Sequence, residues 1–264
     1  MTMSYPVYRF DNAIVRAPSR SVVSGLRDGL GDDPSFEGVK AEHDAYVLAL
    51  KRARVNVHPL EALKKFPDSI FVEDPALVFA QGAILLNPGA ISRRGESAVL
   101  SEALTRHFKV IHRLSGGHAE GGDVLVTNQG VMIGLSERTD RDGANALRSI
   151  LDKMGLKSRI VETPENVLHF KSDCSLLDDN LILTTKRLAS SGVFDDFNIV
   201  TTPEGEEGAA NALRVNDVVF LAQGHPRTRD LLEKAGLDVI LLDTTQISKI
   251  DAGLSCMSLR WSNT

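Results

Sequence analysis

The chain has 264 residues, of which 42% are hydrophobic and 25% are charged, a composition typical of a soluble globular protein. Its formal net charge is -5 and no basic run stands out, which argues against a nucleic acid as the main partner. No stretch approaches the roughly 20 apolar residues of a membrane span, and the first residues lack the pattern of a signal peptide. The two cysteines are too few for a disulfide framework, so we expect a cytoplasmic protein with reduced thiols.

Five short apolar strands recur along the chain, and each is followed by a polar loop. Their spacing of roughly 40–55 residues is typical of one repeated supersecondary unit. If such units surround an axis, equivalent loops face one another, and residues far apart in sequence meet. The predicted strands are 55–60, 110–114, 159–162, 198–201 and 238–242.

Each unit also contains a hairpin and a helix. Residues 123–134 form two β-rich runs around a polar turn, which is a hairpin pattern. An arginine-led turn then opens a helical pattern in residues 144–154, which ends at Gly155. Further hairpins are expected at 77–86, 176–183 and 215–221, and the first unit, with a helix at 39–52, is the least regular.

The repeat predicts ββαβ units in a single domain spanning residues 1–264, because no linker or break in composition divides the chain. The arginine-led turns support it, since Arg93 and Arg138 are 45 positions apart and Arg227 follows after about twice that distance. A doubly wound α/β sheet also alternates strands and helices and remains the alternative.

One polar loop places three carboxylates among apolar residues: Asp68, Glu73 and Asp74. A carboxylate in such a setting is costly to bury unless a positive group meets it. A planar guanidinium meets it well, because its donors match the geometry of a carboxylate. The alternative is a structural salt bridge to Arg93 or Arg94.

Three other loops supply a carboxylate, a histidine and a cysteine. Glycines bracket Glu120 and let the backbone approach a ligand closely, although an ordinary flexible loop has the same composition. His169 is isolated in an apolar run, as a buried core histidine also is. Cys256 follows a glycine-containing turn, whereas Cys174 is expected to be a small buried hydrophobe. Cysteine, histidine and a carboxylate together form an activated thiol nucleophile, so the loops indicate an enzyme.

Four motifs occur in order along the chain: Phe71–Pro75, Glu120–Asp123, Leu168–Lys171 and Gly253–Arg260. With them, the sequence from Val15 onward resembles the dimethylarginine dimethylaminohydrolases of the guanidine-modifying, or pentein, superfamily. The resemblance implies an α/β fold, a five-bladed propeller of ββαβ repeats with pseudo-five-fold symmetry, in agreement with the repeat. Because the superfamily includes arginine deiminases and amidinotransferases, the motifs define the chemistry better than the substrate.

Carried over residue by residue, the resemblance implies that Cys256 is the nucleophile, His169 the general acid/base and Glu120 its carboxylate partner. Other positions match residues that bind the substrate, and the choice between Arg93 and its neighbour Arg94 stays open. The implied substrate-binding residues are Leu26 in a lid loop, Asp68, Glu73 and Asp74 around the guanidinium, Arg93 and Arg138 at the carboxylate, and the backbone carbonyl of Ile250 at the ammonium.

The implied reaction is hydrolysis of an N-methylated arginine to citrulline and methylamine or dimethylamine, through a covalent thiouronium on Cys256. Neither step needs a metal or an organic cofactor, and the expected partner is a small-molecule substrate. Deimination of arginine, hydrolysis of citrulline or hydroxyarginine, and amidino transfer remain alternatives, as does a non-catalytic binder of cationic amino acids. The oligomeric state is open, with a homodimer as one option.

Overall fold

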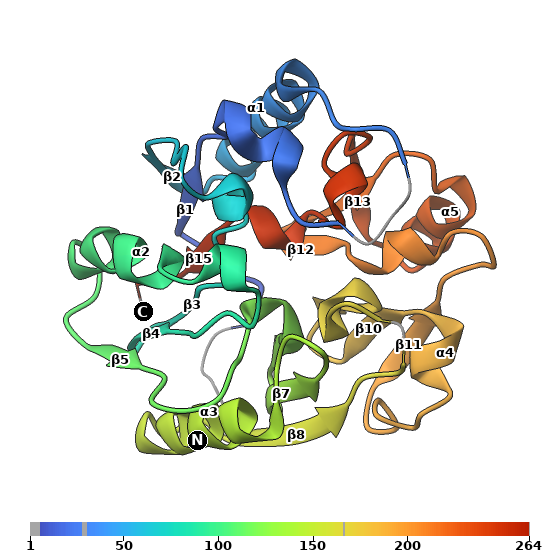
Figure 1. The fold of residues 1–264 in the computed structure, drawn as a ribbon. Coiled ribbons are helices and arrows are strands. Elements are labelled where there is room, and N and C mark those ends of the chain that lie inside the picture. The colour runs from blue at the N-terminus through green and yellow to red at the C-terminus, as the bar shows by residue number, and fades with distance from the viewer. Residues whose placement is uncertain (1–5, 28–30, 166, 264) are drawn as a thin grey trace.

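The computed structural model describes residues 6–27, 31–165 and 167–263, which form five separate three-stranded sheets around a central axis (Figure 1). In each sheet the middle strand pairs antiparallel with one neighbour and parallel with the other. The fold is therefore the expected five-bladed α/β propeller of ββαβ units, and the doubly wound sheet is excluded. Each predicted strand and hairpin lies within two or three residues of an observed one.

Four blades follow one another along the chain, each as strand, strand, helix, strand. The inner strand comes first and the outer strand comes last. The blades are β3 (Ala76–Phe79), β4 (Gly82–Leu85), α2 (Glu96–Thr105) and β5 (Ile111–Arg113); β6 (Val124–Thr127), β7 (Gly130–Leu135), α3 (Arg141–Lys153) and β8 (Ser158–Glu162); β9 (Cys174–Asp178), β10 (Leu181–Thr184), α4 (Lys186–Ala189) and β11 (Asn198–Thr201); and β12 (Leu213–Val215), β13 (Val218–Ala222), α5 (Pro226–Lys234) and β14 (Asp238–Leu242).

The fifth blade joins the two ends of the chain. Its inner strand β15 (Leu259–Trp261) pairs antiparallel with β1 (Asn12–Arg16), which pairs parallel with β2 (Asn56–Leu60). Helix α1 (Phe36–Arg52) connects β1 to β2, and Figure 1 shows β15 in red beside β1 in blue. This blade is the irregular first unit of the sequence, because its first strand comes from the other end of the chain.

Helix α3 shows how the sequence sets the helix ends. The side chain of Asp140 accepts a hydrogen bond from the backbone N–H of Gly143 and so caps the first turn. The helix starts three residues before the predicted start, because that capped first turn precedes the apolar periodicity. Gly155 ends it with φ +74°, a left-handed conformation that suits glycine.

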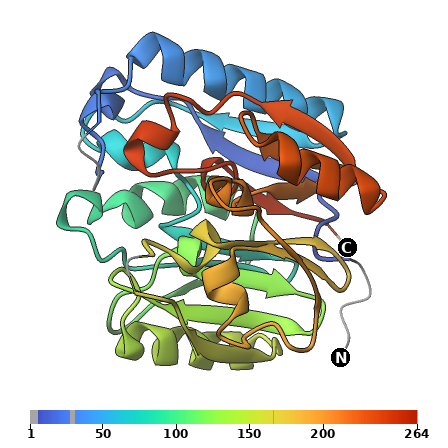
Figure 2. The same cartoon turned by 90° about the vertical axis from the view of Figure 1, so that its right-hand side faces the viewer.

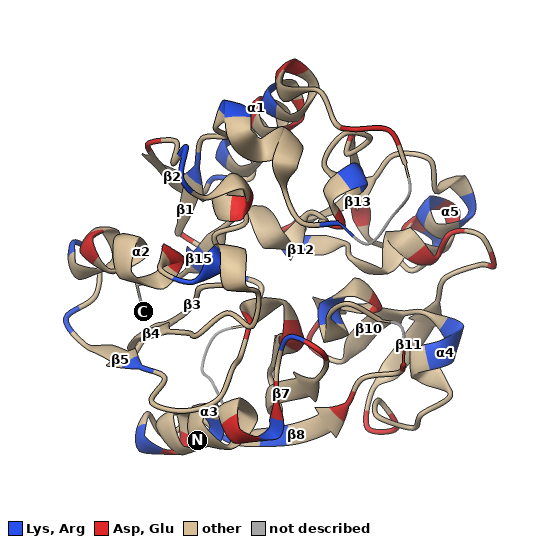
Figure 3. Ribbon diagram, in the orientation of Figure 1, with Lys and Arg blue, Asp and Glu red and all other residues tan. Residues whose placement is uncertain are grey.

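The apolar core is divided among the blades, and the helices lie at the periphery. In one cluster Leu147 and Leu151 of α3 pack with Val131 and Ile133 of β7. Figure 2 shows α1 along one outer side and α3 along the opposite side, with the strands between them. Basic and acidic residues both occur on α1, α3 and α5 (Figure 3). Among the described residues, no helix is long and apolar enough to cross a membrane.

Leu147→Ala should lower the free energy of unfolding by about 2–5 kcal/mol, because it leaves a cavity in a fully buried site. Urea unfolding followed by circular dichroism measures the loss. Leu231→Ala on α5 is the control, since Leu231 is 38% exposed and should cost much less. Equal losses for the two variants would contradict the inward packing of α3.

Candidate active site

A short 3-10 turn precedes the inner strand of every blade, so five equivalent turns meet around the axis. The predicted catalytic residues lie on or beside these turns, because each blade repeats the same connection. Cys256 lies within one turn, and Glu120 and His169 each immediately precede one. The turns are Pro67–Ile70, Gly121–Asp123, Phe170–Ser172, Glu207–Ala210 and Ser255–Met257.

A small pocket of about 30 Å³ lies where the turns meet. Of the ten predicted site residues, all except Glu73 and Glu120 line it. The lining residues are Leu26, Asp68, Phe71, Asp74, Arg93, Arg138, Leu168, His169, Ile250, Asp251, Ala252 and Cys256.

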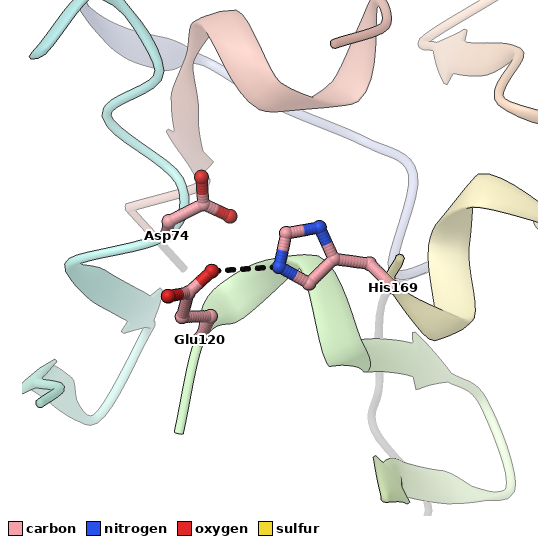
Figure 4. Close-up of side chains that lie close together, drawn as sticks. All are labelled: Asp74, Glu120 and His169. Carbon is pink, nitrogen blue, oxygen red and sulfur yellow. Dashed lines mark hydrogen bonds and ion pairs between the residues drawn. The ribbon is translucent and has the colours of Figure 1, made fainter. Parts of the chain in front are cut away.

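His169 and Glu120 form a buried hydrogen-bonded pair behind the pocket. The Nε2 atom of His169 lies 2.7 Å from Oε2 of Glu120, which is fully buried, and Asp74 faces the pair (Figure 4). The backbone N–H of Gly89 donates to the other oxygen of Glu120 at 3.0 Å. With both oxygens engaged, Glu120 can hold the imidazole in one orientation.

The charge on His169 is stabilised by the acids around it. Burial alone would lower the pKa of this imidazole, but Asp123, the hydrogen bond to Glu120 and the charge of Asp74 outweigh it and raise the pKa to about 9. His169 is therefore protonated at neutral pH, as a general acid requires. Asp123 was not among the predicted site residues; it lies in the Glu120–Asp123 motif and also accepts a hydrogen bond from Phe170 N–H.

The glycines beside Glu120 have a packing role. A Cβ atom on Gly122 would lie 2.6 Å from Cγ of His169, and one on Gly121 would lie 2.0 Å from the carbonyl oxygen of Glu73. Both contacts are too close for any side chain. The glycine pattern thus marks the close approach of this turn to His169 and Glu73, which an ordinary flexible loop would not require.

Cys256 is a partly buried free thiol at the pocket. Burial, together with the negative charges of Asp74 and Glu73, raises the pKa of this thiol to about 12. Cys256 is therefore a neutral thiol at physiological pH until another positive charge arrives. Cys174 is fully buried inside β9, as expected for a small hydrophobe.

Two of the three predicted acids line the pocket. Asp68 accepts a hydrogen bond from Leu26 N–H at 2.8 Å, and burial raises the pKa of its carboxyl. Asp74 is ion-paired to Arg93 and accepts a hydrogen bond from Gly122 N–H. Although burial acts against it, the charges of Arg93 and His169 lower the pKa of Asp74, which keeps it ionised.

Of the two neighbouring arginines, Arg93 is the inward one, since it is buried in the pocket wall while Arg94 is exposed. The guanidinium of Arg93 is already engaged by the protein. It pairs with Asp74 and Glu96, and it donates to two backbone carbonyls. Arg138 is less constrained, because its nearest carboxylate oxygen, on Glu120, is 3.8 Å away and its side chain is 18% exposed.

Glu73 lies outside the pocket lining, unlike the other two acids. Its Oε1 atom accepts from Lys171 Nζ at 2.7 Å and from Arg260 Nη2 at 2.9 Å. Sequence reasoning assigned no role to these two cations, although both belong to the quoted motifs. The available signal was that each is a basic residue in a largely apolar run, where a buried charge needs a partner.

A larger cavity, of about 270 Å³, lies farther along the axis among the inner strands. Its wall includes Leu77, Val124, Ser175, Leu213 and Leu259, one residue from each inner strand. Neither Cys256 nor His169 lines it, so cavity size alone would locate the chemistry in the wrong place.

Comparisons with known proteins agree with this geometry. A family model described as eukaryotic N,N dimethylarginine dimethylhydrolase matches residues 30–172. The N(G),N(G)-dimethylarginine dimethylaminohydrolase of Pseudomonas aeruginosa is 40% identical over 96% of this chain and 100% of its own length. The enzyme of the same name from Streptomyces coelicolor is 32% identical over 94% of this chain and 96% of its own.

Solved structures are similar over the same length. A cysteine-to-serine variant of the Pseudomonas aeruginosa enzyme, complexed with citrulline, has a TM-score of 0.93 at 39% identity and covers 96% of this chain and 100% of its own. The N-terminal domain of the cyanobacterial arginine dihydrolase ArgZ has a TM-score of 0.83 at 17% identity and covers 96% of this chain and 97% of its own. The second likeness shows a shared fold.

The pKa of Cys256 predicts the reactivity of the substrate-free protein. Because the thiolate is the nucleophile, alkylation of Cys256 by iodoacetamide should accelerate about tenfold per pH unit from pH 7 to beyond pH 10. Mass spectrometry of the labelled peptide measures the rate. The peptide containing the buried Cys174 is the internal control and should stay unlabelled. A plateau near pH 8 would contradict a raised thiol pKa.

Proposed function

Because the chain belongs to the dimethylarginine dimethylaminohydrolase family, we propose that it hydrolyses N-methylated arginine to citrulline and dimethylamine or methylamine. The observation that carries the proposal is a pocket shared by a thiol, a protonated imidazole and two acids, with the imidazole held by Glu120. Acids suit a guanidinium, and the thiol suits attack on its central carbon.

Substrate binding itself activates the nucleophile. The charge of Asp74 contributes to the high pKa of Cys256, and a guanidinium placed beside the acid offsets that charge. The pKa of the thiol then falls and its proton leaves to solvent. This arrangement keeps Cys256 unreactive toward other electrophiles until the cation is bound.

The thiolate of Cys256 attacks the guanidinium carbon, a C–S bond forms, and the electron pair of one C–N π bond moves onto nitrogen. His169, which is protonated at neutral pH, gives its proton to the methylated nitrogen of this tetrahedral adduct. The C–N bond breaks and the amine departs. A thiouronium on Cys256 remains, and His169 is left neutral.

Water, activated by the same histidine, completes the reaction. Neutral His169 takes a proton from the water as it attacks the thiouronium carbon, while Glu120 stabilises the imidazolium that forms. The C–S bond then breaks, the remaining hydroxyl proton of the adduct leaves to solvent, and the thiolate is restored as citrulline is released. Each proton that His169 gives in the first half is recovered in the second, so no cofactor enters the cycle.

The remaining pocket residues select the amino-acid end of the substrate. We assign the α-carboxylate to Arg138, since Arg93 is already paired with Asp74 and Glu96. Arg93 then acts by holding Asp74 ionised. Ile250 lines the pocket, and its backbone carbonyl is assigned to the α-ammonium.

Product analysis tests the activity directly. Incubation with asymmetric dimethylarginine, monomethylarginine or arginine should give citrulline and the corresponding alkylamine from the two methylated substrates. Cys256→Ser should abolish turnover in a folded protein, because a serine hydroxyl ionises far less readily than a thiol. Acid-quenched wild type should carry a covalent adduct on Cys256. An adduct on Cys174, or faster release of ammonia from arginine, would contradict the proposal.

Arg138→Ala should raise KM for dimethylarginine strongly but change KM little for a simple alkylguanidine that lacks a carboxylate. The difference follows because an arginine–carboxylate bond has no partner in the truncated substrate. Steady-state kinetics with both substrates gives the comparison, and Arg141→Ala, an exposed arginine paired to Glu162, is the control. An equal rise in KM for both substrates would mean that Arg138 stabilises the fold and does not bind the carboxylate.

A further inference from the structure

The turn that carries Cys256 is held by Asn211 and by an arginine from the following strand. Asn211 accepts a hydrogen bond from Ser255 N–H at 3.1 Å and donates one to Ser255 Oγ at 3.2 Å. Nη1 of Arg260 donates to the carbonyl oxygen of Ser255 at 2.9 Å, to that of Ser258 at 2.7 Å and to Oγ of Ser258 at 2.7 Å. These acceptors lie on both sides of Cys256 in the chain. A single guanidinium thus fixes both ends of the turn.

Glu73 holds that arginine and the same turn. Its Oε1 atom accepts from Nη2 of Arg260, and its backbone N–H donates to the carbonyl oxygen of Cys256 at 3.2 Å. Tyr46 adds a bond between its hydroxyl and Oγ of Ser258 at 2.6 Å. The network is buried, since the side chains of Arg260 and Glu73 are only 10% and 6% exposed.

Neither Arg260 nor Glu73 lines the candidate pocket; both face the larger axial cavity. The turn's own hydrogen bond contributes little to holding Cys256 in place, because the distance from Cys256 N to the carbonyl oxygen of Gly253 is long, at 3.3 Å. Its position therefore depends on groups outside the pocket. An arginine suits this task because its planar fork meets several acceptors at fixed angles, which a lysine ammonium cannot do.

We propose that Arg260 is a positioning residue that aligns the thiol of Cys256 for attack, and that Glu73 acts by holding Arg260 in place. The inference rests on the proposed hydrolysis at Cys256. It also gives Glu73 a role different from that of Asp68 and Asp74, which line the pocket. Loss of alignment should lower kcat and leave KM nearly unchanged, because substrate contacts remain.

Arg260→Met tests the proposal, since methionine retains an extended side chain and removes every donor. A misplacement of about 1 Å costs a reaction about 100-fold, so kcat should fall by about that factor, while KM changes less than about threefold. Arg214→Met is the matched control. Arg214 is the middle residue of β12, as Arg260 is of β15, and lines the same cavity, but it donates to the carbonyl of Asn216. Its kcat should stay near that of wild type.

A double-mutant cycle separates action through Arg260 from contact with the substrate. If Glu73 acts through Arg260, the Glu73→Gln substitution should lower kcat in wild type and have little further effect in Arg260→Met. Multiplicative losses together with a raised KM in Glu73→Gln would overturn the proposal. So would a kcat within about twofold of wild type for folded Arg260→Met, because loss of alignment should cost about 100-fold.

Two further measurements keep the outcome clear. If Arg260→Met does not fold, as judged by circular dichroism, Arg260→Lys replaces it and should retain only part of kcat with an unchanged KM. If the wild-type protein showed no hydrolysis and no adduct on Cys256, the proposed function itself would be refuted. Normal wild-type turnover together with an unaffected Arg260→Lys would refute only the positioning role.

Discussion

The closure of the ring by β15 against β1 is the constraint on which the site depends. Every functional turn precedes an inner strand, and the turn with Cys256 precedes the strand contributed by the end of the chain. Pairing of Ala13 with Arg260 places that turn among those of Asp68, Glu120 and His169. Ring closure therefore also assembles the pocket, and unpairing of β15 would remove Cys256 from it.

The closed ring buries more charge than a core normally tolerates, and the charges stabilise one another. Asp74, Arg93, Glu120 and His169 are buried in contact with partners of opposite sign, which offsets their loss of hydration. Burial and the acids around the pocket raise the pKa of the Cys256 thiol, which therefore stays protonated. In the proposed reaction a cationic substrate supplies the charge that the site lacks, so recognition and activation have the same physical origin.

Sequence reasoning recovered the blades and most of the pocket, because both follow from a repeat that is visible in the chain. Hydrophobic alternation and the glycine at 155 are local signals, and the equivalence of the loops brought Cys256, His169 and Asp68 together. The environment of Glu73 was not recoverable in this way. Glu73 and Asp74 are adjacent but face different partners, a choice set by the packing of Lys171 and Arg260 in three dimensions.

Three blades pair an acid beside the 3-10 turn with an arginine near the start of the helix. In the blades of α4 and α5 the arginine lies in the first turn of the helix and the pair is close: Arg187 with Asp173 at 2.5 Å and Arg227 with Glu206 at 3.1 Å. In the blade of α3 the arginine, Arg138, precedes the helix and lies 3.8 Å from Glu120. If Arg138 bound a carboxylate of another molecule, Glu120 would stay in place, because the hydrogen bonds of Glu120 to His169 and Gly89 remain. In the proposed function, the looser pair therefore leaves Arg138 for the substrate without releasing the carboxylate that holds the imidazole of His169.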